Sequence, residues 1–140
     1  MEIPCVTLTA DIIIEYDDDS IVLIKRKHDP YKGQWAIPGG ILEGDETIEE
    51  TAVREAKEET GLDVKLVKIV GVYSKAGRDT RGRFVTVAFT AIPVGGVLKA
   101  SSDAKEFLRT KDYAKMSLAF DHNQIIADYI RNRKLGKSDK

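Results

Sequence analysis

The sequence is poor in the residues that form disulfides and zinc sites. Its 140 residues include one cysteine, Cys5, and two histidines, His28 and His122, which lie far apart along the chain. A single cysteine excludes an internal disulfide, and so few histidine and cysteine ligands argue against a zinc site. No positively charged leader with an apolar centre precedes Cys5. We therefore expect a cytoplasmic protein.

Long hydrophobic runs and an excess of one charge are also lacking. The apolar runs are far shorter than the roughly 20 residues that a membrane-spanning helix needs. The chain carries 22 basic and 23 acidic residues, a formal net charge of −1 at pH 7. These features predict no membrane partner, no nucleic-acid partner and a small-molecule ligand.

A single folded domain fits the chain length. With 42% hydrophobic residues, a chain of 140 residues can bury a substantial core but has no room for a second domain. We expect one domain over residues 1–135 and a frayed basic tail over 136–140.

Runs of β-branched and apolar residues predict an α/β protein. Residues 5–16 and 21–27 read as the two strands of a hairpin, which would leave an edge free for pairing. The strongest strand pattern covers 84–93, which we expect at the centre of a sheet. Further predicted elements are strands at 35–37, 63–74 and 97–100 and an amphipathic helix at 118–133.

A helix is predicted at 48–60. Thr47 and Glu50 form a T-x-x-E capping box, and Gly61 suits the left-handed residue beyond the helix end. Just upstream, Gly39 and Gly40 predict a tight turn whose carbonyl groups are free to face a metal.

Three carboxylates converge on one face of this helix. Glu55, Glu58 and Glu59 stand at positions i, i+3 and i+4, a spacing at which like charges repel. Within the run only Arg54 and Lys57 offset them. Most charge runs are solvated helix faces, and a divalent cation such as Mg²⁺ or Mn²⁺ is the alternative explanation.

The surrounding residues favour the metal site. They fill the pattern G-x₅-E-x₇-R-E-U-x-E-E-x-G-U, in which U is apolar. This stretch resembles the Nudix box, the signature of hydrolases that act on nucleoside diphosphates linked to another moiety. The resemblance implies the Nudix α/β/α sandwich, with a mixed β-sheet between helices, and a hydrolase that uses Mg²⁺ or alternatively Mn²⁺. The matching residues are Gly40, Glu46, Arg54, Glu55, Ala56, Glu58, Glu59, Gly61 and Leu62.

The resemblance also implies a role for each charged residue of the box. Arg54 and Glu46 would form an orienting ion pair beside the metal. The expected metal ligands are Glu55 and Glu59, with Glu58 and the carbonyl of Gly39 as further ligands.

Outside the box, Asp103 and Glu106 are the acidic residues near an expected strand. Related chains place a glutamate at about position 106. Glu106 is therefore expected to bind the metal or to activate water as the base. Without the resemblance, a surface acid is the better interpretation.

Candidate substrate-binding residues lie in two further segments. The loop at 75–83 carries Arg78 and Arg81, whose planar forks match phosphate oxygens, although a solvated hairpin tip is the simpler reading. Arg26, in a basic trio at a strand end, is a third candidate for a phosphate contact. Trp35 either packs in the core or forms an aromatic wall for a base.

A second resemblance concerns the substrate. Residues 72–89 are similar to the V-Y-S-x-P-G-R-D-P-R-G segment of the ADP-ribose pyrophosphatase branch of the Nudix family. Ala76 and Thr80 replace the usual prolines, so we expect a less rigid loop. The implied reaction splits ADP-ribose into AMP and ribose 5-phosphate. Many relatives form homodimers, which makes a homodimer an expectation here.

Two alternative functions stay open. The same chemistry could act on a nucleoside triphosphate or another sugar nucleotide. A sensor that binds ADP-ribose without hydrolysing it belongs to a different class. The complete set of box glutamates and the lack of room for a helix-turn-helix domain disfavour the sensor.

Overall fold

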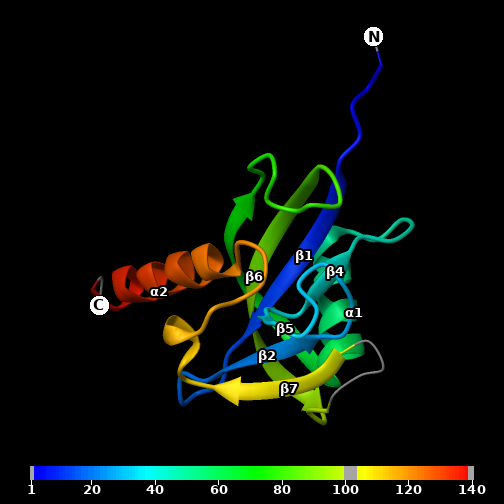
Figure 1. Ribbon diagram of the computed structural model, residues 1–140. Coiled ribbons are helices and arrows are strands. Elements are labelled where there is room, and N and C mark those ends of the chain that lie inside the picture. The colour runs from blue at the N-terminus through cyan, green and yellow to red at the C-terminus, as the bar shows by residue number, and fades with distance from the viewer. Residues whose placement is uncertain (1, 100–103, 139–140) are drawn as a thin grey trace.

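The structure is a computed structural model that describes residues 2–99 and 104–138. In Figure 1 the helices lie on opposite sides of long central strands. In the described part of the chain the elements are β1 (Thr7–Ile14), β2 (Ile21–Arg26), β3 (Trp35–Ala36), β4 (Gly39–Ile41), α1 (Ile48–Thr60), β5 (Leu62–Tyr73), β6 (Phe84–Gly96), β7 (Ala104–Thr110), the 3₁₀ turn η1 (Tyr113–Lys115) and α2 (His122–Ser138).

The strands form two sheets. The larger sheet has the order β4-β1-β6-β5, in which β1 and β6 run parallel and the outer pairs are antiparallel. The smaller sheet is antiparallel, with the order β3-β2-β7. The central position predicted for the strand at 84–93 is confirmed, since β6 lies between β1 and β5.

Side chains of β1 alternate between two hydrophobic cores. Ile12 and Ile14 pack with Ala56 of α1, whereas Ile13 packs with Ile125 of α2. All five are completely buried. Because successive residues of a strand point to opposite faces, the larger sheet is covered by one helix on each side. The predicted sandwich with a mixed sheet between helices is confirmed.

Helix α1 has the predicted bounds and caps. The Thr47 hydroxyl accepts a hydrogen bond from the Glu50 N–H at 3.1 Å, and the Glu50 carboxylate accepts one from the Thr47 N–H at 2.9 Å. Gly61 ends the helix with φ 79°. Since both ends are fixed by local contacts, the bounds of α1 follow from the sequence around them.

The predicted hairpin of the first two strands is wrong. β1 and β2 belong to different sheets, and an isolated bridge from Glu15 to Ile21 is the pairing recorded at their turn. β1 is buried, so the backbone N–H and C=O groups along both of its edges need partners, which β4 and β6 supply. It has no free edge, and the edge strands of the larger sheet are β4 and β5.

Several predicted boundaries also need correction. The glycine turn at 39–40 is part of β4, which pairs with β1. Residues 97–99 form no strand, and Ala100 lies outside the described residues. Helix α2 begins at His122 rather than at 118 and continues to Ser138. Residues 136–138 of the expected tail thus belong to α2, and residues 139 and 140 lie outside the described residues.

Candidate active site

A pocket of about 310 Å³ lies where both sheets, α1 and the start of α2 meet. Its lining combines acidic and basic side chains. The acidic groups come from β1, α1, the segment before α1 and the loop between β5 and β6. The basic groups come from β2 and the same loop. The charged lining residues are Asp11, Glu43, Glu55, Glu59 and Asp79 together with Arg26, Arg78 and Arg81.

Glu59 lies deep in the pocket wall. Its Oε1 accepts a hydrogen bond from the Gly39 N–H at 3.2 Å. Burial, followed by the nearby charge of Glu55, raises the pKa of Glu59 to about 8. A cation bound beside these carboxylates would reverse that shift, so the electrostatics suit a metal ligand.

Glu55 reaches the pocket across Gly40. A Cβ at Gly40 would lie 2.3 Å from the Glu55 carboxylate carbon, so only glycine leaves room for this approach. The Glu55 side chain is 13% exposed. Burial raises the pKa of its carboxyl group against the opposing effect of Arg54.

Arg54 ties together the charged residues of the box. Its Nε donates to Glu46 at 2.6 Å, and its Nη1 donates to Glu55 at 2.8 Å and to Glu58 at 3.1 Å. Its Nη2 donates to the carbonyl of Ile41 at 3.0 Å. The hydrogen bond from Arg54 lowers the pKa of Glu46 to about 2. Arg54 therefore holds Glu55 in one orientation, as an orienting residue should.

The carboxylate set fits a hard divalent cation. Glu55 and Glu59 line the pocket, whereas Glu58 is 54% exposed, pairs with Arg54 and does not line it. Over residues 2–99 and 104–138, no group of three or more His, Cys, Asp or Glu side chains already stands close enough to hold a metal. Carboxylate oxygens suit a hard divalent cation.

Glu106 does not lie in the pocket. It is on β7, opposite Lys25 of β2, with its carboxylate 4.0 Å from the Lys25 ammonium and 54% exposed. The neighbours of Lys25, Ile24 and Arg26, line the pocket, so Lys25 and Glu106 belong to the opposite face of the sheet. This placement does not fit the expected metal-binding or base role of Glu106. Asp103 lies outside the described residues.

Arg78 is committed to structural contacts. Its Nε and Nη2 donate to Asp121 at 2.8 and 2.6 Å, and its Nη1 donates to the Thr86 hydroxyl at 2.7 Å. Its side chain is 6% exposed. Arg78 therefore fastens the loop to the residue before α2, and these contacts restrain a loop that lacks prolines at Ala76 and Thr80.

Arg81 and Arg26 differ in the donors that they leave free. Arg81 uses Nε and Nη2 on Asp79, at 3.0 and 2.8 Å, and its guanidinium carbon lies 4.7 Å from the ring centre of Phe84. Arg26 donates through Nε to the carbonyl of Pro30 at 2.7 Å. Its two terminal amino groups make no hydrogen bond within the described chain. Among the arginines that line the pocket, Arg26 therefore has the most side-chain donors available to bind a phosphate group.

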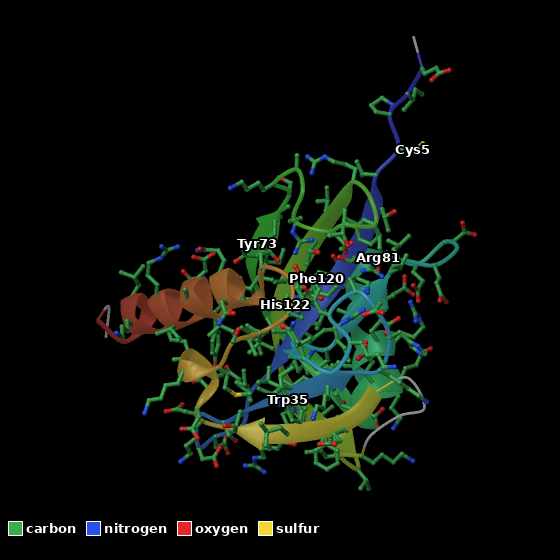
Figure 2. All side chains as sticks on the ribbon, viewed as in Figure 1. Cys5, Trp35, Tyr73, Arg81, Phe120 and His122 are labelled. Carbon is green, nitrogen blue, oxygen red and sulfur yellow. The ribbon has the colours of Figure 1, made fainter. Side chains whose placement is uncertain are left out.

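Trp35 has a packing role. It is half-buried against the core that involves α2, and the Lys25 ammonium lies 5.5 Å from its ring centre. In Figure 2, Phe120 and His122 lie next to each other and Trp35 lies apart from both. The aromatic rings that line the pocket are those of Phe84 and Phe120, so the core-packing alternative describes Trp35.

Sequence reasoning missed the segment that enters α2. Phe120 and His122 line the pocket, and Asp121 holds Arg78. His122 also approaches Asp11 of β1, with 3.3 Å between Nε2 and Oδ2. The available signal was a lone aspartate within the apolar run that forms β1. The amphipathic pattern of the C-terminal segment indicates only a core helix and does not show that residues at its start line the pocket.

The chain is similar in sequence to known proteins. The chain is 50% identical over 126 residues to the ADP-ribose pyrophosphatase of Methanocaldococcus jannaschii, covering 89% of this chain and 73% of the relative. It is 33% identical over 131 residues to the ADPR responsive transcriptional repressor NtrR of Acinetobacter baylyi, covering 88% of this chain and 52% of the repressor.

The fold of the chain is also similar to that of solved structures. The NUDIX domain of Shewanella oneidensis NrtR, in a cocrystal structure with ADP ribose, superposes with a TM-score of 0.79 at 27% identity. The match covers 93% of this chain and 90% of that domain. The model of the NUDIX domain family matches residues 6–130. This match, the 50% identical relative and the shared fold show that the chain belongs to the NUDIX domain family.

Proposed function

We propose that the protein hydrolyses the pyrophosphate bond of ADP-ribose to give AMP and ribose 5-phosphate. The observation that carries this proposal is the presence, in one pocket, of the carboxylates of Glu55 and Glu59 and of the Arg26 guanidinium group, whose terminal amino groups make no hydrogen bond within the described chain. The 50% identical relative named as an ADP-ribose pyrophosphatase supports the choice of substrate.

Glu55 and Glu59 are the proposed principal ligands of a Mg²⁺ ion, with Mn²⁺ as the alternative. Glu58 and the carbonyl of Gly39 are proposed as further ligands. When bound, such a cation neutralises phosphate charge and lowers the pKa of a bound water. Glu58 lies outside the pocket while paired with Arg54, so its participation requires that ion pair to rearrange.

The other residues of the site bind and orient. Arg54 holds the Glu55 carboxylate through a hydrogen bond of 2.8 Å. Arg26 offers two terminal amino groups to the phosphate oxygens, and burial lowers the pKa of its guanidinium group without removing its charge. Arg78 acts indirectly, by holding the loop beside the pocket.

A substrate panel tests the proposal. The full chain, supplied with Mg²⁺, is assayed against ADP-ribose, another sugar nucleotide and a nucleoside triphosphate, with products separated by chromatography. We expect the highest kcat/KM for ADP-ribose, with AMP and ribose 5-phosphate formed in equal amounts. A higher kcat/KM for a triphosphate would overturn the substrate assignment while leaving the chemistry intact.

The sensor remains the second candidate because one relative is an ADP-ribose-responsive repressor. Isothermal titration with ADP-ribose, run beside the turnover assay, separates the two. Tight binding without any metal-dependent turnover would establish the sensor, whereas turnover would exclude a purely sensory role.

We further propose a cytoplasmic homodimer. The single cysteine supports the location, because the chain can form no internal disulfide.

The edge strand β5 supports the assembly as a homodimer, since Val67, Ile69 and Val72 on it are each more than half exposed. Light scattering should give twice the chain mass, and Ile69→Asp should halve it. A monomeric mass for the unmodified chain would contradict the dimer.

No helix in the described ranges is long and apolar enough to cross a membrane.

A further inference from the structure

Asp11 is a buried carboxylate in the pocket that the reaction outlined above does not use. It stands in the middle of β1, is 7% exposed and lines the same pocket as Glu55 and Glu59. The described contact of its Oδ2 is with Nε2 of His122, at 3.3 Å. A buried carboxylate is costly unless something compensates its charge. His122 is the nearest group that could supply this compensation.

The hydrogen bonds of His122 define its tautomer. Nδ1 accepts a hydrogen bond from the Ile37 N–H at 3.0 Å, so this nitrogen carries no hydrogen. The hydrogen of the neutral ring is therefore on Nε2, which faces Asp11. His122 is 5% exposed, and its ring centre lies 5.4 Å from that of Phe120. A neutral imidazole can orient the Asp11 carboxylate but leaves its negative charge in place.

Asp11 and Glu59 meet at the same residue, Gly39. The Gly39 N–H donates to Glu59 Oε1 at 3.2 Å. A Cβ at Gly39 would lie 2.2 Å from Asp11 Oδ1. Both carboxylates therefore approach the same residue, and a side chain there would clash with Asp11.

Charged groups of both signs line the pocket beside Asp11, and Arg78 and Arg81 of the loop between β5 and β6 are among them. Glu59 and Glu55 come from α1, and Arg26 of β2 is the cation whose charge interacts with both Asp11 and Glu59. The charge of Asp11 also contributes to the raised pKa of Glu59, after burial and Glu55. Asp11 of β1 thus shares the pocket with Glu55 and Glu59 of α1, and a divalent cation would compensate these carboxylates.

We propose that Asp11 is an additional carboxylate of the cation site formed with Glu55 and Glu59, and that His122 is a positioning residue that holds Asp11 there. This inference rests on the proposed divalent-cation chemistry. It extends the site from helix α1 to strand β1 and gives His122 a role that depends on its Nε2–H.

Two substitutions of His122 separate this role from packing. Asn places an oxygen near the position of Nδ1, so His122→Asn keeps an acceptor for the Ile37 N–H and loses the donor toward Asp11. Gln reaches further, so His122→Gln keeps a donor near the position of Nε2. If His122 acts through Asp11, His122→Gln should retain more cation affinity than His122→Asn.

The test measures Mn²⁺ binding by the full chain without substrate, using the electron paramagnetic resonance signal of free Mn²⁺. Asp11→Asn should weaken the affinity about tenfold or more, and His122→Asn should weaken it by a smaller factor. The double variant should bind as weakly as Asp11→Asn alone. Glu106→Gln, which removes the same charge from an exposed position on β7, should leave the affinity unchanged.

Each outcome decides between the alternatives. Unchanged Mn²⁺ affinity in a folded Asp11→Asn protein, as judged by circular dichroism, would overturn the inference. Additive losses in the double variant would overturn the positioning role of His122. Should Asp11→Asn not fold, Asp11→Ser is measured under the same criteria. Hydrolysis of ADP-ribose by the unmodified chain is assayed separately, so a failure of the proposed function remains distinguishable from a failure here.

Discussion

The carboxylate of Glu55 occupies the space that a side chain at Gly40 would need. A Cβ at Gly40 would lie 2.3 Å from the Glu55 carboxylate carbon and 2.4 Å from its Oε1. The two residues come from α1 and from β4, which pairs with β1. The position of this carboxylate in the pocket therefore depends on a missing side chain in a neighbouring strand.

Gly40→Ala should reduce activity far more than stability. The φ angle of Gly40 is not in the left-handed region, and the atoms that an alanine would meet are the mobile end of Glu55. The backbone should remain in place while the carboxylate moves away. We expect kcat/KM to fall by roughly 10- to 100-fold, as for misplaced metal ligands, with little change in Tm.

Gly136→Ala provides the matched control for this substitution. Gly136 lies in α2 with no atom within 4 Å of an added Cβ. Alanine should leave activity unchanged and should stabilise the helix slightly. Equal kcat/KM values for the Gly40→Ala and unmodified proteins would show that the close approach of Glu55 is unimportant for function.

The metal-free protein should lose stability as the pH rises toward 8. The pKa of Glu59 is raised to about 8 in the folded chain, against 4.5 for an ordinary glutamate. Between these pH values the folded chain binds a proton that the unfolded chain has released. The stabilising contribution is complete below pH 4.5 and is lost as the pH rises through about 8. Thermal unfolding in a chelator should therefore show Tm falling by roughly 5 °C or more over this range.

Glu59→Gln separates this effect from the other ionisable groups. Glutamine cannot ionise, so the variant should show a much flatter dependence of Tm on pH. Added Mg²⁺ should raise the Tm of the unmodified protein at pH 8 and should have little effect on the variant. An unmodified protein whose Tm does not change between pH 6 and pH 8 in the chelator would contradict the assigned environment of Glu59.

Arg26 and Arg78 should respond differently to substitution. Arg26→Lys removes the planar fork and should raise the KM for ADP-ribose by about tenfold with little change in Tm. Arg78→Lys breaks a paired contact with Asp121 in which Arg78 is 6% exposed, so it should lower Tm by several degrees, a loss of about 3 kcal/mol or less. Steady-state kinetics and thermal unfolding of both variants give the comparison. A higher KM from Arg78→Lys at unchanged Tm would reverse these roles.

The sequence predicted the features of the fold and site that are determined locally. Helix α1 and its caps depend on Thr47, Glu50 and Gly61, which are close together in the chain, and the structure places them as expected. The spacing of Glu55 and Glu59 likewise put both on one helix face. Both now line the pocket, although their proposed binding of a metal is still a prediction.

Features that depend on contacts between distant parts of the chain could not be predicted from local sequence patterns. The distribution of β1 and β2 between two sheets follows from long-range pairing with β6 and β7. Whether a residue lines the pocket also depends on the register of its strand. The pairing of β7 with β2 places Glu106 outside the pocket. The contact of Asp11 with His122 joins residues from opposite ends of the chain. No local pattern specifies such a pair.

Release of AMP from ADP-ribose by the unmodified protein and by Glu59→Gln, each with and without Mg²⁺, tests the central claim most directly. We predict Mg²⁺-dependent turnover by the unmodified protein and a decrease of more than about a hundredfold in a variant whose circular dichroism is unchanged. Glu106→Gln should retain its activity in the same assay. Turnover by Glu59→Gln at the unmodified rate would contradict the assignment of this pocket as a metal-dependent hydrolase site.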